Sequence, residues 1–194
     1  MRMPILKTAD VAAIAVAIGL SIGRLGCFLS GCCYGAVSES ALSLRFAGYV
    51  SALRPDGSCP PRYDLLHSPD GPLCAFGRPA FLDQAKAGLL SHGSQLSLPV
   101  LPTQLMESAL GMLLFCWLWF WRRKRRLFPG HSMCEFVLFY AIGRFCLEFL
   151  RADQRGIWLG GFMSTSQLIA LPLALLAAWG LWRGHRARVL DGVA

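Results

Sequence analysis

Four apolar runs constrain the fold of this sequence more than any other feature, because each is long enough to cross a lipid bilayer. They cover residues 11–29, 101–121, 133–150 and 166–182. A helix needs roughly 20 mostly apolar residues to cross the hydrocarbon core. Helix is the expected conformation, since lipid offers no hydrogen-bonding partners to backbone N–H and C=O groups. The sequence therefore predicts an all-α fold class, a polytopic membrane helical bundle with about four transmembrane helices.

The charge content agrees with this prediction. Only 15% of the 194 residues are charged, whereas a soluble domain carries about 25%. A net charge of +8 would suggest nucleic acid as a partner for a soluble protein. Here the basic residues cluster at the ends of the apolar runs, a position that suits anionic lipid headgroups. We therefore expect membrane lipids as partners, and no nucleic acid.

The same basic residues predict the topology. They are Arg2 and Lys7 before the first run, the stretch 122–126 after the second, and Arg183, Arg186 and Arg188 after the fourth. Cytoplasmic flanks of membrane helices are enriched in Lys and Arg, so both termini are expected in the cytoplasm. Residues 1–194 would then form a single membrane domain. A large irregular loop at about 30–100 and a short loop at about 153–161 would face the opposite side.

The first run also has features of a secretory signal peptide, namely a basic start, an apolar core and small residues. Leu25-Gly26-Cys27 matches the end of a lipoprotein cleavage box. Arg24, however, stands where such a box needs an apolar residue, and Asp10 interrupts the start of the run. We therefore expect the first run to be a retained transmembrane helix.

Ionisable residues inside the third apolar run are the strongest functional candidates. Arg144, Glu148 and Arg151 stand at i, i+4 and i+7, a spacing that places them on one helix face. An ionisable side chain within such a run costs a few kcal/mol on insertion and usually faces a bundle interior or a wet cavity. One interpretation is purely structural, because Arg144 and Glu148 can neutralise each other.

Arg24, near the end of the first run, has no acidic residue close to it in sequence. It therefore needs a partner from another helix, for which Gln104 and Glu107 are candidates, or from a ligand. Guanidinium groups bind phosphate through two parallel hydrogen bonds and keep their charge when desolvated. Arg24 and Arg144 together thus indicate a phospholipid headgroup as the bound anion.

Four sequence blocks carry a more specific signal. Residues 23–35 read G-R-L-G-C-F-L-S-G-C-C-Y-G, and residues 102–107 read P-T-Q-L-M-E. The stretch 140–153 contains R-F-C-L-E-F-L-R, and residues 164–168 read S-T-S-Q-L. In this order, the blocks resemble the conserved segments of the prolipoprotein diacylglyceryl transferase family. The resemblance covers most of the chain outside residues 36–99.

The resemblance implies an enzyme of the bacterial inner (plasma) membrane. Members of that family transfer the diacylglyceryl group of phosphatidylglycerol to the thiol of the lipobox cysteine of a prolipoprotein, in the signal-peptide region. By this resemblance the catalytic residues would be Arg24 and Arg144, which hold the phosphate, and Glu148, which orients Arg144. Substrate-binding roles would fall to Gly35, Gln104, Glu107 and Arg151. The resemblance implies no metal and no cofactor.

The sequence also departs from the family pattern. Cys27, Ser30 and Cys32 stand where the family has Asn, Asn and Glu. The family also has further spans before this region, with a histidine in an H-G-G segment, and none of the four histidines here has a matching context. We therefore expect an N-terminally shortened or divergent member. A non-catalytic phospholipid-binding homologue is the alternative.

The cysteines allow a further, less favoured interpretation. Cys27, Cys32 and Cys33 cluster after the first run, in a C-x4-C-C pattern that matches no strong zinc motif. They are compatible with a thiol-redox pair, a soft-metal site or an incidental role, so a membrane thiol-redox protein is a second alternative. Cys59 and Cys74 are a plausible structural disulfide in an oxidising compartment.

Overall fold

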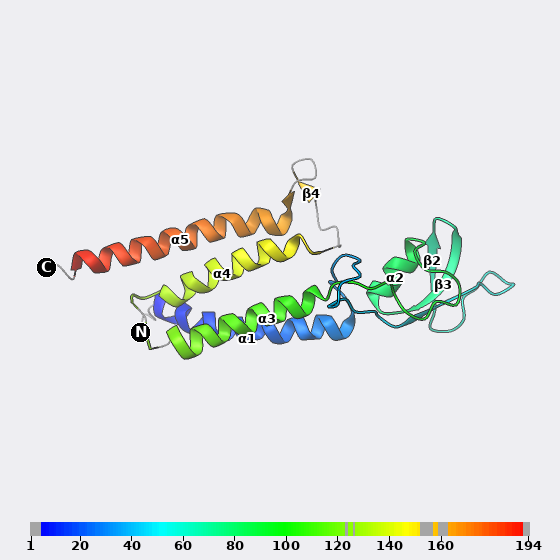
Figure 1. Ribbon diagram of the computed structural model, residues 1–194, viewed down its shortest axis with the longest axis horizontal. Coiled ribbons are helices and arrows are strands. Elements are labelled where there is room, and N and C mark those ends of the chain that lie inside the picture. The colour runs from blue at the N-terminus through cyan, green and yellow to red at the C-terminus, as the bar shows by residue number, and fades with distance from the viewer. Residues whose placement is uncertain (1–4, 123, 126, 152–156, 159–162, 192–194) are drawn as a thin grey trace. The chain divides into compact units, whose positions relative to one another are not determined.

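The structure is a computed structural model that describes residues 5–122, 124–125, 127–151, 157–158 and 163–191 (Figure 1). The chain forms two compact units. The helical unit contains the long helices as far as Leu25, from Leu105 to Phe149 and in the C-terminal part. The sheet unit contains Gly26–Gln104 and the segment that begins at Leu150.

The helical unit is built from long, apolar helices. They are α1 (Ile5–Ser30, which ends in the sheet unit), α3 (Thr103–Cys116) with its π-helical continuation η1 (Trp117–Arg122), α4 (His131–Glu148) and α5 (Thr165–Asp191). Within the described residues, three helical stretches are long and apolar enough to cross a membrane: Ile5–Ser30, Thr103–Arg122 and Thr165–Val189. These correspond to the first, second and fourth predicted runs. The third run is also helical, as the 18-residue α4, but α4 carries three charged residues, Glu135, Arg144 and Glu148.

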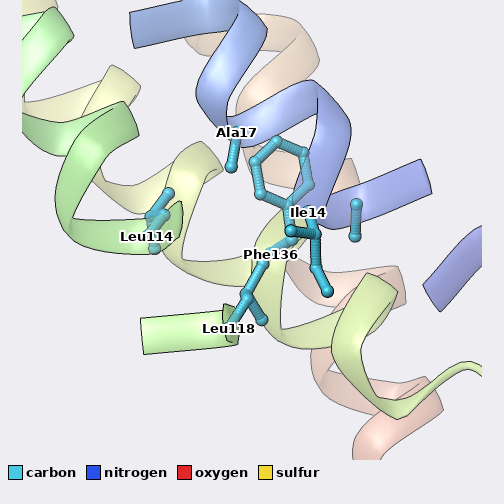
Figure 2. Packing of buried hydrophobic residues seen from close by; sticks show 6 residues of the cluster. Ile14, Ala17, Leu114, Leu118 and Phe136 are labelled. Atoms are coloured by element: carbon cyan, nitrogen blue, oxygen red, sulfur yellow. The ribbon is translucent and has the colours of Figure 1, made fainter. Parts of the chain in front are cut away.

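The core of the helical unit lies where α1, α3 with η1, and α4 meet (Figure 2). Small residues on α1 let α3 approach closely. A Cβ atom on Gly111 would lie 3.0 Å from the Ser21 nitrogen and 3.1 Å from the Ala17 oxygen. Ser108 of α3 donates a hydrogen bond to the Ser21 carbonyl oxygen at 2.9 Å. Close approach through small residues and serine hydrogen bonds is typical of membrane helix pairs. The buried core residues are Ala13, Ile14, Ala17, Leu114, Leu118 and Phe136.

Two buried carboxylates of the helical unit have structural partners. Asp10, only 1% exposed, accepts hydrogen bonds from the backbone N–H groups of Gly130 at 2.9 Å and Met133 at 3.1 Å. These groups lie at the start of α4, where backbone donors lack intrahelical partners and a negative charge is favoured. Glu135 accepts hydrogen bonds from Arg122 Nε at 2.8 and 2.7 Å. The fold therefore provides partners for both of these charged residues, which lie within or beside apolar runs.

The sheet unit differs from the prediction for residues 30–100. That segment was expected to be irregular within an all-α fold. It instead contains an antiparallel sheet of order β1-β3-β2, made of β1 (Gly48–Ser51), β2 (Asp64–Ser68) and β3 (Gly71–Gly77), followed by α2 (Pro79–Lys86). The strands are short and alternate weakly, so their apolar pattern is hard to distinguish from that of a loop.

The core of the sheet unit forms between the sheet and α2. Phe81 is fully buried with Val50, Leu73 and Ala75. Gly48 of β1 makes this possible, because a Cβ atom there would clash with the Phe81 ring at 2.3 Å. The buried cluster thus depends on one glycine at the ring contact.

The predicted bridge between Cys59 and Cys74 is confirmed. It ties the segment before β2 to β3 across 15 residues of sequence. In the helical unit, the two-residue strands β4 (Ile157–Trp158) and β5 (Met163–Ser164) pair before α5. The rest of the predicted loop at 153–161 lies outside the described residues.

Candidate functional site

Four of the predicted residues form one arginine–glutamate network in the helical unit. Glu107 of α3 lies between the two arginines. Its Oε2 is 2.6 Å from Nε of Arg24 on α1, and its Oε1 is 3.2 Å from Nη1 of Arg144 on α4. Arg144 Nη1 also lies 2.5 Å from Glu148 Oε2, one helical turn further along α4. The structure therefore brings Arg24, Glu107, Arg144 and Glu148 together.

The α1–α3 packing explains how Arg24 reaches Glu107. Ser21 and Ser108 hydrogen bond across the two helices. Arg24 follows Ser21 by three residues and Glu107 precedes Ser108, so the contact lies next to this hydrogen bond. The sequence named Glu107 as one of two candidate partners, and only the packing of two helices distinguishes it from Gln104.

The network is buried and balanced in charge. The exposed fractions of the side chains are 21% for Arg24, 2% for Glu107, 11% for Arg144 and 8% for Glu148. Two guanidinium groups and two carboxylates sum to a formal charge of zero. Because buried ion pairs contribute little net stability while an uncompensated buried charge is costly, this balance by itself is a structural necessity. A ligand role for the network must therefore rest on more than its charges.

Arg144 retains hydrogen-bonding capacity despite its ion pairs. Among the described residues, neither its Nη1 nor Glu148 Oε2 has a hydrogen bond of good geometry, although the two atoms lie 2.5 Å apart. The two charges are therefore close enough to form an ion pair, but the Nη1–H groups of Arg144 do not point at an acceptor in the described part of the chain. Arg144 Nη2 donates to the Ser166 hydroxyl of α5 at 3.1 Å.

The sequence block at residues 164–168 forms the start of α5 and positions Ser166. Ser164 N donates to Gln167 Oε1 at 3.0 Å, and Gln167 N donates to the Ser164 hydroxyl at 3.3 Å. This reciprocal pair is a capping box, which satisfies backbone donors at a helix start. It fixes the first turn of α5, from which Ser166 reaches Arg144. Ser166 was not among the predicted site residues, although the S-x-x-Q pattern marks this helix start.

An apolar groove of about 360 Å³ begins at the same arginine. It lies between α4 and α5, which run side by side (Figure 1). Arg144 and Ser166 line one end of it. From there the lining continues along α4 to Phe136 and along α5 to Leu173. Phe136 and Arg144 are eight residue steps apart, which corresponds to about 12 Å of helix. The groove thus joins a long apolar wall to a polar end.

The remaining predicted residues belong to the sheet unit, where they shape the backbone after α1. Gly35 N donates to the Leu101 oxygen at 2.8 Å, and Gly35 forms an antiparallel bridge with Arg151. A Cβ atom on Gly35 would lie 2.7 Å from the Leu150 oxygen, so only glycine permits this close approach. Buried Gln104 donates from Nε2 to the Cys32 oxygen at 2.7 Å. Gly35 and Gln104 therefore hold a turn in place.

The cysteines of the C-x4-C-C pattern also meet in the sheet unit. The Sγ atoms of Cys27, Cys32 and Cys33 all lie within 4.8 Å of one another, and none of these cysteines is in a disulfide. Burial, assisted by the neighbouring Cys33, raises the pKa of the Cys32 thiol to about 11. Cys32 is therefore expected to remain protonated at neutral pH.

Apolar helices around a buried ion-pair network, beside an apolar groove, define a membrane protein with a polar site among its helices. Residues 1–183 match the family model for prolipoprotein diacylglyceryl transferase, and the chain belongs to this family. It is 30% identical over 198 residues to the phosphatidylglycerol–prolipoprotein diacylglyceryl transferase of Xylella fastidiosa strain M12, an alignment that covers 99% of this chain and 59% of that protein. It is also 30% identical over 171 residues to phosphatidylglycerol–prolipoprotein diacylglyceryl transferase 2 of Clostridium perfringens strain 13, with 86% of this chain and 48% of that protein covered. The chain thus spans about half to three-fifths of the length of these relatives.

Proposed function

We propose that this chain binds phosphatidylglycerol and transfers its diacylglyceryl group to the lipobox cysteine thiol of a prolipoprotein. One observation carries the proposal: the arginine–glutamate network stands at the polar end of the apolar groove between α4 and α5. The names of the relatives support the same substrates.

In this proposal the lipid lies along the groove. An acyl chain packs against the apolar wall that ends at Phe136 and Leu173, and the phosphate lies at Arg144. The Ser166 hydroxyl, which already accepts a hydrogen bond from Arg144, rotates to donate to a phosphate oxygen. Arg24 completes the phosphate site from α1. Glu148 orients the Arg144 guanidinium.

The reaction needs charge stabilisation at this point. The sulfur of the acceptor thiolate attacks the glycerol carbon that carries the phosphate, the carbon–oxygen bond breaks, and glycerol phosphate leaves with an added negative charge. Preorganised donors aimed at such developing charge are usually the largest single contribution to catalysis. The thiol proton must also be removed. The two carboxylates of the network, Glu107 and Glu148, are the candidates to accept it.

The other candidate residues are assigned to substrate binding. Gly35 and Gln104 hold the backbone that follows α1, and Arg151 contacts the lipid headgroup. Glu107 keeps both arginines of the network in position. These assignments combine the family resemblance with the backbone contacts of Gly35 and Gln104.

We also propose four membrane spans, at 11–29, 101–121, 133–150 and 166–182, within one membrane domain over residues 1–194. The membrane is the bacterial inner membrane, and both termini are cytoplasmic. The basic residues at the ends of η1 and α5 support this orientation. The bridge between Cys59 and Cys74 fits an oxidising compartment on the opposite side, where the segment 30–100 would lie.

The direct test uses the purified chain in detergent with phosphatidylglycerol and a lipobox peptide. We expect a thioether-linked diacylglyceryl peptide in the mass spectrum, and its loss in an Arg24→Gln variant. A longer family member, assayed in parallel, serves as the positive control. If only the longer member forms product, transfer by this chain is refuted.

A non-catalytic, lipid-binding role is the second candidate, favoured by Cys27, Ser30 and Cys32 at positions where the family has amide and carboxylate residues. Native mass spectrometry distinguishes the two candidates. Retained phosphatidylglycerol without product formation would establish binding alone. Loss of both would refute the phosphate assignment as well.

A further inference from the structure

The three clustered cysteines are held by backbone contacts on both sides of a tight turn. Gly31, with φ of +75°, lets the chain reverse after α1, and Cys32 N then donates to the Cys27 oxygen at 3.2 Å. The Cys32 carbonyl accepts a hydrogen bond from Gln104 Nε2 at 2.7 Å, and the Cys33 carbonyl accepts one from the Thr103 hydroxyl at 3.0 Å. The turn therefore presents three thiols from a fixed backbone.

Strain at Cys33 accompanies this arrangement. Its φ is +59°, a left-handed conformation that is uncommon for residues other than glycine, asparagine and aspartate. Such strain persists only where surrounding contacts hold it. Here it brings the Cys33 Sγ to within 4.8 Å of both other sulfur atoms.

The spacing of the sulfur atoms suits a metal ion. Metal–thiolate bonds are about 2.3 Å long, so three sulfurs around one ion lie about 4 Å apart. The cluster, with its three Sγ atoms within 4.8 Å, needs only small rotations to reach that separation. Among the described residues it offers sulfur ligands alone, without a histidine or carboxylate.

Ligand type and number select among the metals. Thiolates favour soft ions such as copper(I) and zinc. Structural zinc sites almost always have four protein ligands, whereas copper(I) accepts three sulfurs in a planar arrangement. A set of three thiols therefore favours copper(I).

We propose that Cys27, Cys32 and Cys33 form a three-thiolate site for copper(I). Binding forms three copper–sulfur bonds, and the three S–H protons are released to solvent; no change of oxidation state is needed. None of the site's three ligands lines the lipid groove or belongs to the arginine–glutamate network. Failure of lipid transfer therefore leaves this proposal unaffected.

The test titrates the reduced full chain in detergent with copper(I), against bicinchoninate as a competing chelator. We expect one tightly bound copper per chain. X-ray absorption of the loaded protein should show copper surrounded by three sulfur atoms. This measurement needs no variant, so it does not depend on the folding of a mutant.

Variants then locate the ligands. Cys32→Ser should weaken copper binding at least about tenfold, because loss of even an outer-shell partner costs about 10–100-fold in metal affinity. The matched control is Cys146→Ser, which removes an exposed thiol of α4 and should leave the affinity unchanged. Thermal unfolding of each variant in detergent checks that the fold is retained.

Three results would overturn the proposal. One is equal copper binding by the triple variant Cys27→Ser/Cys32→Ser/Cys33→Ser. Another is an absorption spectrum dominated by nitrogen or oxygen neighbours. The third is a disulfide between two of the three cysteines in protein purified without reductant from copper-supplemented cells, which would favour a thiol-redox role.

Discussion

Replacing Arg144 with alanine removes the guanidinium that lies 3.2 Å from Glu107 and 2.5 Å from Glu148. Both carboxylates are nearly inaccessible, at 2% and 8% exposed. The variant leaves them with Arg24 alone, so the network changes from a formal charge of zero to −1. Removing one partner from a buried ion pair costs about 3–5 kcal/mol, and we expect a loss of unfolding free energy in this range.

A charge-balanced double variant separates this structural cost from ligand binding. Arg144→Gln combined with Glu148→Gln leaves the pair between Arg24 and Glu107, 2.6 Å apart, with no net charge. We expect it to recover most of the stability lost by Arg144→Ala. It still lacks the proposed phosphate ligand, so lipid transfer should remain reduced by about 10²–10³, the effect of losing one preorganised donor.

Stability would be measured by unfolding in detergent, and phosphatidylglycerol binding by native mass spectrometry alongside the transfer assay. Arg188→Ala, an exposed arginine near the end of α5, is the matched control and should change none of the three. If the double variant is as unstable as Arg144→Ala, the charge-balance explanation is wrong. If it transfers lipid at the wild-type rate, Arg144 is not the phosphate ligand.

Three further predictions address other parts of the chain. Gly35→Ala should destabilise the sheet unit by about 1–3 kcal/mol, as overpacking does, because the added Cβ would lie 2.7 Å from a backbone oxygen. Gly19→Ala is the control, since Gly19 has open space around it, and it should not destabilise the protein in the same unfolding assay. Asp10→Ala should cost about 0.5–2 kcal/mol through loss of the cap on α4, read from the same assay, and an unchanged midpoint would contradict that role. Alkylation of Cys32, monitored by mass spectrometry, should be slow at pH 8, because only the thiolate reacts. The rate should increase as the pH rises towards the pKa of about 11. A rate that is already maximal at pH 8 would contradict the raised pKa.

Contacts within one helix were predictable from the sequence, and contacts between helices were not. The spacing i, i+4 alone places Glu148 beside Arg144, and the structure has them 2.5 Å apart. Arg24 required a partner from another helix, and the choice between Gln104 and Glu107 depends on the rotation of α3 against α1. Ser166 was not predicted because its role depends on how α5 packs against α4.

The sheet unit shows a second limit. Its strands have four to seven residues, too short for the alternation of apolar residues to stand out. Turn-rich sequence such as 55–61 suggests a loop whether or not the flanking segments pair. The disulfide between Cys59 and Cys74 was nevertheless predicted, because an oxidising compartment would permit a disulfide between cysteines of the segment 30–100.

Charge balance also bears on which step of the proposed reaction the network assists. A neutral network gains little net attraction for a phosphodiester with one negative charge. As the carbon–oxygen bond breaks, the departing phosphate gains a second charge, and the N–H groups of Arg144 that lack well-aligned partners can turn towards it. An interaction that strengthens as this charge develops lowers the barrier by more than it tightens the binding of the intact lipid. The carboxylates that neutralise the network before the reaction therefore leave the arginines to act mainly in the transition state.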